Sequence, residues 1–363
     1  MSAATNRDGP ADKRNNMDLL RLLFACSVMV YHAIVLSRWR SPHLSLFTDL
    51  AGVGVDGFFV ISGFLIFQSY EKSQSLKDYV QKRIRRIYPA YATVIAAIIV
   101  MGAAVTELPL SDYIGRRLAR FALTNLAFLN FLDPAPPGVF LHNPVTAVDG
   151  SLWTIKVEVM FYVSVPIIVW ACRHAPRSAL FCLIYVLSTL YRLFFSRLFV
   201  TTGHDVYDTL AKQLPGQMTF FISGASLYYY RQAVKKYSKL VISAAAVLVA
   251  LYFRGWPLQP IFPAALSIVV IAVAFGPYMG NAGCFGDFSY GVYIWHFPII
   301  QAFVANGLFA SQPRAAFATS LGFTLALAFL SWHLVEKRFL KHSSHYRRNS
   351  GDTILDSRHS SLS

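Results

Sequence analysis

The sequence predicts an all-α fold, a polytopic bundle of transmembrane helices, and two observations support this prediction. Of the 363 residues, 55% are hydrophobic and only 14% are charged, whereas soluble domains carry about 25% charged residues. The mean hydropathy is +0.45. Apolar runs of about 20 residues, the length that crosses a bilayer, recur from Leu19 to Leu334.

Ten candidate spans follow from these runs. They lie roughly at 18–37, 52–70, 87–106, 151–172, 178–196, 214–230, 239–253, 258–278, 288–309 and 315–335. The first run follows basic residues as a signal peptide would, but Arg21 interrupts it and no cleavage site follows, so we expect a retained span. Amphipathic pieces at 76–86 and 111–131 lie between spans.

The positions of the basic residues predict the topology. The net charge is +15, and most lysines and arginines flank the apolar runs, which argues against nucleic-acid binding. Connections on the side of the N-terminus and of the 71–86 loop hold the larger share, so we expect that side, with both chain termini, to be cytoplasmic. The cluster of Arg116, Arg117 and Arg120 conflicts with this, but it lies in an amphipathic segment where the rule weakens.

We expect one membrane-embedded domain over residues 16–339. The flanking segments 1–15 and 340–363 are polar and are expected to be disordered. The four cysteines are Cys26, Cys172, Cys182 and Cys284, and none form a CxxC pair. We therefore expect neither a disulfide framework nor a metal site.

The first span contains ionisable residues that are costly in a membrane: Asp18, Arg21 and His32. Arg21 and His32 are eleven residues apart, which on a helix is three turns plus ~20°, so they share a face ~16 Å apart. An arginine near the cytoplasmic surface suits a phosphate, and a deeper histidine suits a general base. The alternative is that Arg21 snorkels to the headgroups and His32 bonds a neighbouring helix.

A paired-arginine motif, "RIRRIYPAY", starts the third span at 83–91. Arg83 and Arg86 are three apart and share a helical face, where they can clamp phosphates, whereas Arg85 points off that face. The alternative is a positive-inside anchor that contacts anionic lipids.

Glu158 lies inside the fourth span. If that span starts at the outer surface near Ser151, Glu158 lies ~10 Å below the surface. His32 lies at a similar depth, so we expect the two side chains to meet and the carboxylate to orient the imidazole. Lys156 is two residues away and should face the other way.

The ninth span carries a polar stripe, Tyr290, Tyr293 and His296, at intervals of three. We expect the stripe to support the site, and the alternative is that it forms a hydrogen-bonding seam between helices. Near the end of the last span, His333 and Glu336 are also three apart, and we expect an interfacial pair.

Several motifs in this order resemble the acyltransferase-3 family of integral-membrane acyltransferases, over Asn16 to Phe339. The motifs are Arg21-x10-His32 with Asp18, "GVDGFFVISGFLI" (54–66), "RIRRIYPAY" (83–91), "DGSLWTIKVEVMFY" (149–162), "FSYGVYIWHFPI" (288–299) and the terminal "EKRF". The resemblance implies transfer of an acyl group, often acetyl from acetyl-CoA, to a surface glycan or its lipid-linked precursor. It implies no permanently bound cofactor, and a location in the bacterial inner membrane among membrane lipids.

The resemblance also assigns roles to residues. His32 would be the catalytic histidine and Glu158 the acidic residue at the reaction centre. Arg21, Arg83 and Arg86 would contact the CoA phosphates. Apart from the resemblance, we expect Asp18, Tyr293 and His296 to support these site residues. Two other functions stay open: a transporter or flippase for a lipid-linked sugar, whose pathway would be lined by ionisable residues, and a non-catalytic subunit of a polysaccharide assembly complex.

Overall fold

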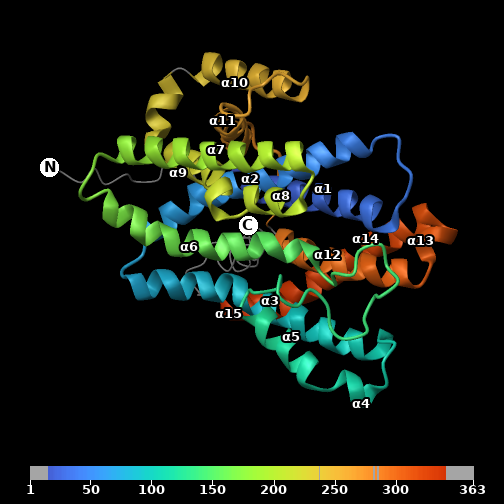
Figure 1. Cartoon of the computed structure of the whole chain (residues 1–363). Coiled ribbons are helices and arrows are strands. Elements are labelled where there is room, and N and C mark those ends of the chain that lie inside the picture. Colours follow the sequence, from blue (N-terminus) through green and yellow to red (C-terminus); the bar gives the residue numbers. More distant parts are fainter. Residues whose placement is uncertain (1–14, 237, 281–282, 284–285, 341–363) are drawn as a thin grey trace, which may run out of the picture.

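The computed structural model describes residues 15–236, 238–280, 283 and 286–340, and the regular structure in this part of the chain is helical (Figure 1). The helices are α1 (Met17–Ser37), α2 (Leu44–Glu71), α3 (Leu76–Val105), α4 (Leu110–Tyr113), α5 (Arg116–Leu126), η2 (Gly150–Leu152), α6 (Trp153–Ala171), α7 (Arg177–Thr202), α8 (Asp205–Ala211), α9 (Leu214–Lys236), α10 (Ser238–Phe253), α11 (Phe262–Ala274), α12 (Phe288–Ala305), α13 (Leu308–Ser311), α14 (Pro313–Ser331), η3 (Trp332–Glu336) and α15 (Lys337–Phe339). Apart from Asn15 and Leu340, the two terminal segments expected to be disordered lie outside the described residues.

Each of the ten predicted spans overlaps one of these helices. Among the described residues, six helices are long and apolar enough to cross a membrane: α1, α2, α3, α6, α7 and α14 with its extension. Helices α10 and α11 are apolar but have only 16 and 13 residues, and α9 and α12 carry more polar side chains. The protein is therefore an integral membrane protein, whereas the span count of ten and the cytoplasmic termini stay predictions.

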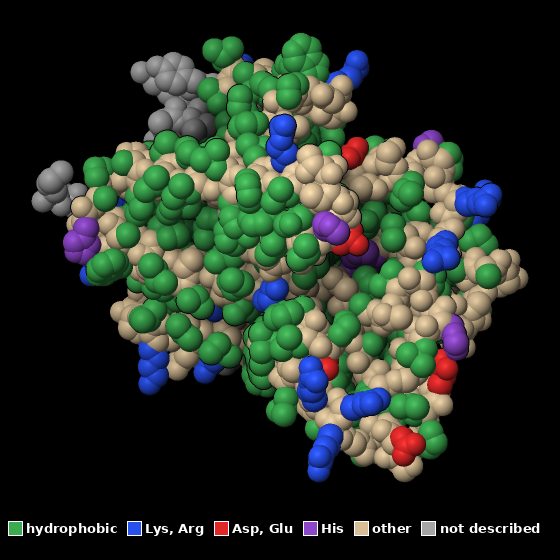
Figure 2. All heavy atoms as spheres, viewed as in Figure 1, with side chains coloured by type: hydrophobic (Ala, Val, Ile, Leu, Met, Phe, Trp, Pro, Cys, Tyr) green, Lys and Arg blue, Asp and Glu red, His purple; other side chains and the backbone are tan. Residues whose placement is uncertain are grey.

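Helix α1 lies between α2 and α12. It packs against α2 on one side and α12 on the other, α2 also packs against α9, and α12 against α14. The outer faces are apolar, and Figure 2 shows hydrophobic side chains over α6 and α7. Charged side chains gather instead around α4 and α5, which project from the bundle at the lower right of the figures. This projection contains the basic cluster that conflicts with the predicted topology.

Helices α2 and α9 touch through two glycines. A Cβ on Gly63 would overlap the carbonyl oxygen of Phe221, and a Cβ on Gly224 would overlap that of Val60. Small residues of this kind let two membrane helices approach until their backbones are in contact. The contact fixes α2, which supplies one wall of the site described below.

Helix α3 is a single long helix where the sequence predicted an amphipathic piece followed by a separate span. Its N-cap is Ser75, whose side chain accepts a hydrogen bond from the backbone N–H of Asp78, and the helix continues through Pro89. Proline removes one backbone hydrogen bond but does not end this helix. Arg83 and Arg86 therefore lie on the same rigid element as the membrane-embedded half of α3.

The helical segment that contains Glu158 begins inside the bundle and not at its surface. Asp149 and Ser151 are 4% and 0% exposed, and Asp149 Oδ1 accepts hydrogen bonds from the N–H and the hydroxyl of Ser151 at 3.0 and 2.6 Å. The preceding loop is tied to α12, because Gln301 Nε2 donates to the carbonyl oxygens of Val145 and Ala147, both at 2.6 Å. This deep start changes the position of every residue along α6.

Candidate active site

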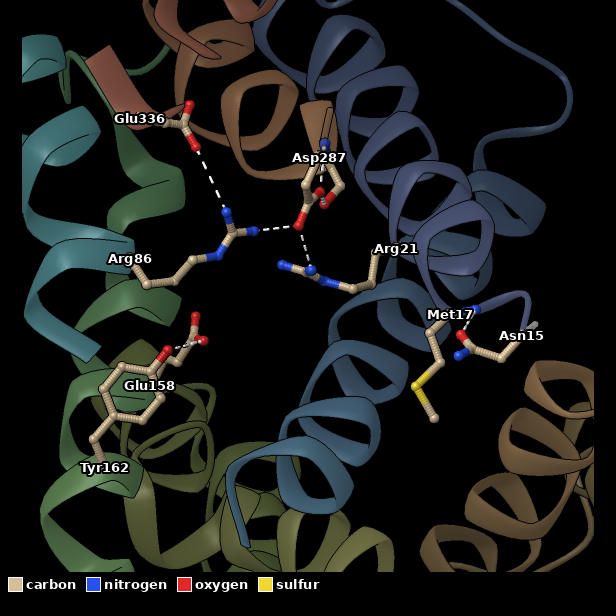
Figure 3. Close-up of polar contacts among 9 residues, drawn as sticks. Asn15, Met17, Arg21, Arg86, Glu158, Tyr162, Asp287 and Glu336 are labelled. Carbon is tan, nitrogen blue, oxygen red and sulfur yellow. Dashed lines mark hydrogen bonds and ion pairs between the residues drawn. The ribbon is translucent and has the colours of Figure 1, made fainter. Parts of the chain in front are cut away.

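Two arginines from different helices converge on one buried carboxylate (Figure 3). Arg21 Nη1 on α1 lies 2.5 Å from Asp287 Oδ2, and Arg86 Nη2 on α3 donates to the same oxygen. Glu336 Oε2 lies 3.8 Å from Arg86 Nη1. Two predicted phosphate-binding arginines are thus brought together with Asp287, which the sequence analysis did not single out, and with Glu336, which it expected at the membrane interface.

Asp287 links this charge cluster to α12. Its other oxygen, Oδ1, accepts hydrogen bonds from the Ser289 N–H at 3.2 Å and the Ser289 hydroxyl at 2.5 Å, so Asp287 caps the helix. Burial by itself raises the pKa of Asp287, but the guanidiniums of Arg21 and Arg86 outweigh it and hold the pKa below its usual range. The carboxylate is therefore ionised, and it holds the two cations side by side.

The predicted arginine pair on α3 has different partners. Arg83 Nη2 donates to the Ser69 hydroxyl at 3.0 Å, and its guanidinium carbon lies 5.6 Å from the centre of the Tyr162 ring. Arg85 is exposed, whereas Arg83 and Arg86 are half-buried. The two arginines that share a face therefore both turn toward the bundle, but only Arg86 reaches the cluster around Asp287.

Glu158 lies near the arginine end of the site and does not contact His32. Its Oε1 accepts a hydrogen bond from the Tyr162 hydroxyl at 2.5 Å, and it faces the gap beside the arginines in Figure 3. The predicted contact with His32 is wrong because the helical segment starts deep in the bundle, so that the eight residues from Gly150 carry Glu158 past the level of the histidine. Lys156 lies elsewhere, with Nζ 4.8 Å from the centre of the Phe131 ring.

A narrow cavity of about 40 Å³ lies between Arg21 and Tyr293. It is lined by Arg21, Val55, Phe58, Phe59, Ser62, Thr154, Ile155, Glu158, Tyr290 and Tyr293. Tyr293 lies at the far end, where its hydroxyl accepts a hydrogen bond from Thr154 at 2.8 Å and its ring centre is 5.8 Å from that of His296. The cavity thus leads from an arginine to the neighbourhood of a histidine.

His32 pairs with His296 of α12. His32 Nδ1 lies 2.8 Å from His296 Nε2, and the two rings are nearly parallel, 12° apart, with centres separated by 5.1 Å. His296 is 0% exposed, whereas His32 is half-buried. The face of α1 that carries Arg21 and His32 is therefore the face that packs toward α12. His32 also bonds a neighbouring helix, as the alternative interpretation of this residue predicted.

The rest of the α12 stripe also bonds across helices. The Tyr290 hydroxyl donates to the Ile87 carbonyl oxygen at 3.1 Å, while Tyr293 bonds Thr154 as above. The stripe is therefore a seam between helices, and Tyr290 and Tyr293 also line the cavity. Asp18 is half-buried in the first turn of α1.

The predicted interfacial pair of His333 and Glu336 is wrong. Glu336 is 2% exposed and accepts a hydrogen bond from the Ser331 hydroxyl at 3.1 Å, whereas His333 Nδ1 lies 2.9 Å from the Phe329 carbonyl oxygen. The cause is a π-helical turn over Trp332–Glu336. Its wider register turns Glu336 away from the expected α-helical position and into the bundle.

A wider hollow of about 620 Å³ opens at the other end of α1. It is lined by Ile34, Val35, Arg38, Trp39, Arg40, Ser41, Pro42 and Leu44, which we call the α1-end groove. Val35 lies one helical turn beyond His32. Arg38 ends the helix with a left-handed backbone, φ 52°, a conformation that is uncommon outside glycine. Arg38 and Arg40 are exposed, and neither has an ion-pair partner among the described residues.

The fold and the site together define a membrane-embedded protein with an ionic site at one end of α1 and a histidine pair further along it. Residues 14–333 match the family model Acyl_transf_3, an acyltransferase domain. The chain therefore belongs to this family, as the sequence motifs indicated, and it is a transferase. The alternatives of a transporter and a non-catalytic subunit have no support from these comparisons.

Curated relatives agree with this assignment. The chain is 30% identical to an O-acetyl transferase of Shigella phage Sf6, over 92% of this chain and 98% of the relative. It is 28% identical to nodulation protein 10 of Rhizobium leguminosarum bv. viciae, over 90% and 94%. It is 26% identical to the peptidoglycan O-acetyltransferase OatA of Listeria monocytogenes, over 88% of this chain but 55% of that protein. No solved structure matches the chain.

Proposed function

We propose that this protein transfers an acetyl group from acetyl-CoA to a hydroxyl of a cell-surface or secreted polysaccharide, or of its lipid-linked precursor, in the inner membrane of a bacterium. The observation that carries the proposal is the arrangement along α1. Arg21 lies in a cluster of cations at one end of a cavity, and the His32–His296 pair lies beyond its other end. The acetyl group and the saccharide class follow from what the relatives are named for.

The donor would bind with its phosphates at the arginines and its pantetheine arm in the cavity. Arg21 and Arg86 donate to the same oxygen of Asp287, so their guanidiniums lie side by side, and two adjacent guanidiniums are well suited to phosphate oxygens. A cavity of about 40 Å³ is too narrow for the arm, so the lining side chains, among them Phe58 and Phe59, must move apart on binding. Glu158 lies along this path and is placed to accept a hydrogen bond from an amide N–H of the arm.

The reaction would use His32 as a general base. The acceptor hydroxyl gives its proton to His32 and its oxygen attacks the carbonyl carbon of the thioester. The carbon–sulfur bond then breaks, and the proton passes from His32 to the leaving thiolate of CoA. The acetyl ester and free CoA thiol are the products, and His32 is neutral again.

The acceptor would approach from the α1-end groove. The groove begins one turn beyond His32 and is wide enough for a sugar unit. Trp39 offers a flat apolar surface for a sugar ring, and Arg38 and Arg40 offer unpaired guanidiniums. Two such cations favour an acceptor that carries a carboxylate or phosphate, including a phosphate that links a glycan to a lipid.

Acetyl transfer from labelled acetyl-CoA to candidate glycans, measured at matched membrane expression, tests this proposal. His32→Ala should lower the rate by about 10²–10⁴-fold, the usual cost of losing a general base, while CoA still raises the thermal stability of the variant in detergent. Lys156→Ala is the control. Lys156 lies on the helix that carries Glu158, but its side chain lies against Phe131 and outside the site. The activity of the Lys156→Ala variant should therefore stay near that of the parent. Parental activity in His32→Ala would exclude the mechanism.

A further inference from the structure

The hydrogen bonds of His296 determine which of its ring nitrogens carries the proton. Nδ1 lies 3.1 Å from the carbonyl oxygen of Val292, and a carbonyl oxygen only accepts hydrogen bonds, so Nδ1 must be the donor. In a neutral imidazole the other nitrogen, Nε2, then carries a lone pair. A neutral ring is also what the surroundings require, because His296 is 0% exposed and has no carboxylate in ion-pair contact among the described residues.

The same reasoning fixes the tautomer of His32. Its Nδ1 lies 2.8 Å from the lone pair of His296 Nε2, so Nδ1 of His32 must be the donor of this hydrogen bond. Nε2 of His32 is then the unprotonated nitrogen, and it has no hydrogen-bond partner among the described residues. The ring is also held in place, since Phe297 packs against it edge-on with ring centres 4.9 Å apart and Tyr31 packs with centres 5.4 Å apart.

We propose that His296 is a positioning residue for the transfer reaction: it holds His32 in the Nδ1–H tautomer and so makes Nε2 the nitrogen that takes the proton of the acceptor hydroxyl. This inference rests on the proposed function and adds a second histidine to it. When His32 Nε2 accepts the proton, the ring becomes an imidazolium whose Nδ1–H still donates to His296. The hydrogen bond therefore also stabilises the charge that forms during the reaction.

The test compares two substitutions of His296. Leucine is apolar and offers no acceptor, whereas glutamine supplies a carbonyl oxygen that can accept the Nδ1–H of His32. We expect His296→Leu to lower kcat for acetyl transfer by about 10²-fold or more, since a wrong tautomer disables a general base, and His296→Gln to retain at least about tenfold more activity than His296→Leu. The CoA dissociation constant should stay within about twofold of the parent in both.

A pH profile separates positioning from a purely structural role. Removing the acceptor destabilises the imidazolium form of His32, so the acid limb of kcat/KM should move to lower pH in His296→Leu and stay near the parental position in His296→Gln. ¹⁵N NMR of histidine-labelled protein gives an independent reading, in which His32 of the parent shows a protonated Nδ1 and an unprotonated Nε2. His174→Leu is the matched control, since His174 Nδ1 also lies 3.3 Å from a backbone carbonyl oxygen, that of Trp170, but on an exposed site.

The outcomes distinguish this inference from the proposed function. If His32→Ala abolishes transfer but His296→Leu keeps the parental kcat and pH profile, the role of His296 is refuted and the base remains. Equal loss in the leucine and glutamine variants with an unmoved acid limb also refutes it. If His32→Ala retains parental activity, the proposed function itself fails.

Discussion

Replacing Asp287 by asparagine removes a negative charge that Arg21 and Arg86 share. The asparagine side-chain oxygen can still accept from Ser289, so the cap of α12 survives and the substitution isolates the ionic contribution. Removing one partner of a buried ion pair costs about 3–5 kcal/mol, because the remaining charge is left uncompensated. Here the two guanidiniums are 17% and 14% exposed and Glu336 remains 3.8 Å from Arg86, so we expect the lower end, about 3 kcal/mol.

Unfolding of the purified protein in detergent, by heat or by denaturant, measures this loss. Asp205→Asn is the control, because Asp205 is exposed in the first turn of α8 and its loss should change stability by less than about 0.5 kcal/mol. The pKa of Asp287 is lowered in the folded state, so its contribution is present above the unfolded pKa of about 4 and is lost as pH falls below it. Asp287→Asn should lack that acid-dependent loss.

Addition of CoA gives a second reading of the same variant. Phosphates that bind between Arg21 and Arg86 would replace the missing charge, so saturating CoA should stabilise Asp287→Asn more than it stabilises the parent. The double variant Asp287→Asn/Arg86→Gln should recover part of the lost stability, which a double-mutant cycle expresses as a coupling energy. Stability of Asp287→Asn equal to that of Asp205→Asn would refute the reasoning that this carboxylate compensates the arginines.

Three further predictions concern the donor, the buried loop and the acceptor. Arg21→Ala should weaken CoA binding by about tenfold or more, the equivalent of one charge-assisted contact, whereas Arg85→Ala should leave it unchanged in the same titration. Burial raises the pKa of Asp149 to about 7, so the parent loses stability as pH rises from about 4 through 7, and Asp149→Asn, which keeps the cap on Ser151, should unfold at a higher temperature than the parent at pH 8.5 but not at pH 4. Arg38→Ala and Arg40→Ala should raise the KM for an anionic acceptor without changing CoA affinity, and equal effects on a neutral acceptor would contradict the role assigned to their charges.

Helix periodicity and hydropathy were sufficient to predict much of the architecture. Each expected span overlaps a helix, and the eleven-residue spacing of Arg21 and His32 places both on the face of α1 that meets α12. The same periodicity places Arg85 in an exposed position beside two half-buried arginines. These features are local, because they depend only on the geometry of one continuous helix.

The features that could not be predicted depend on long-range packing or on irregular turns. The depth of Glu158 was wrong because depth was counted from the membrane surface, whereas the segment starts at Asp149 inside the bundle. Asp287 was missed because it lies in a short connection without periodicity, and its partners are 266 and 201 residues away. Its position two residues before Ser289, at the start of a predicted span, was the available signal of a helix cap. The π-helical turn that includes Glu336 has no comparable signal in the sequence.

A single rigid helix carries Arg21, His32 and the start of the α1-end groove. The helix therefore fixes the distances between these three features. The rise between Arg21 and His32 is ~16 Å. If the proposed donor binds with its phosphates at Arg21, its thioester would reach the histidine only when the phosphates are about that far from the acyl group. Short thioesters without a phosphate would have to find the same position unaided and should be poor donors. Insertion of one residue between Arg21 and His32 would rotate the histidine by ~100° away from α12, which separates donor anchoring from catalysis while each half of the helix remains intact.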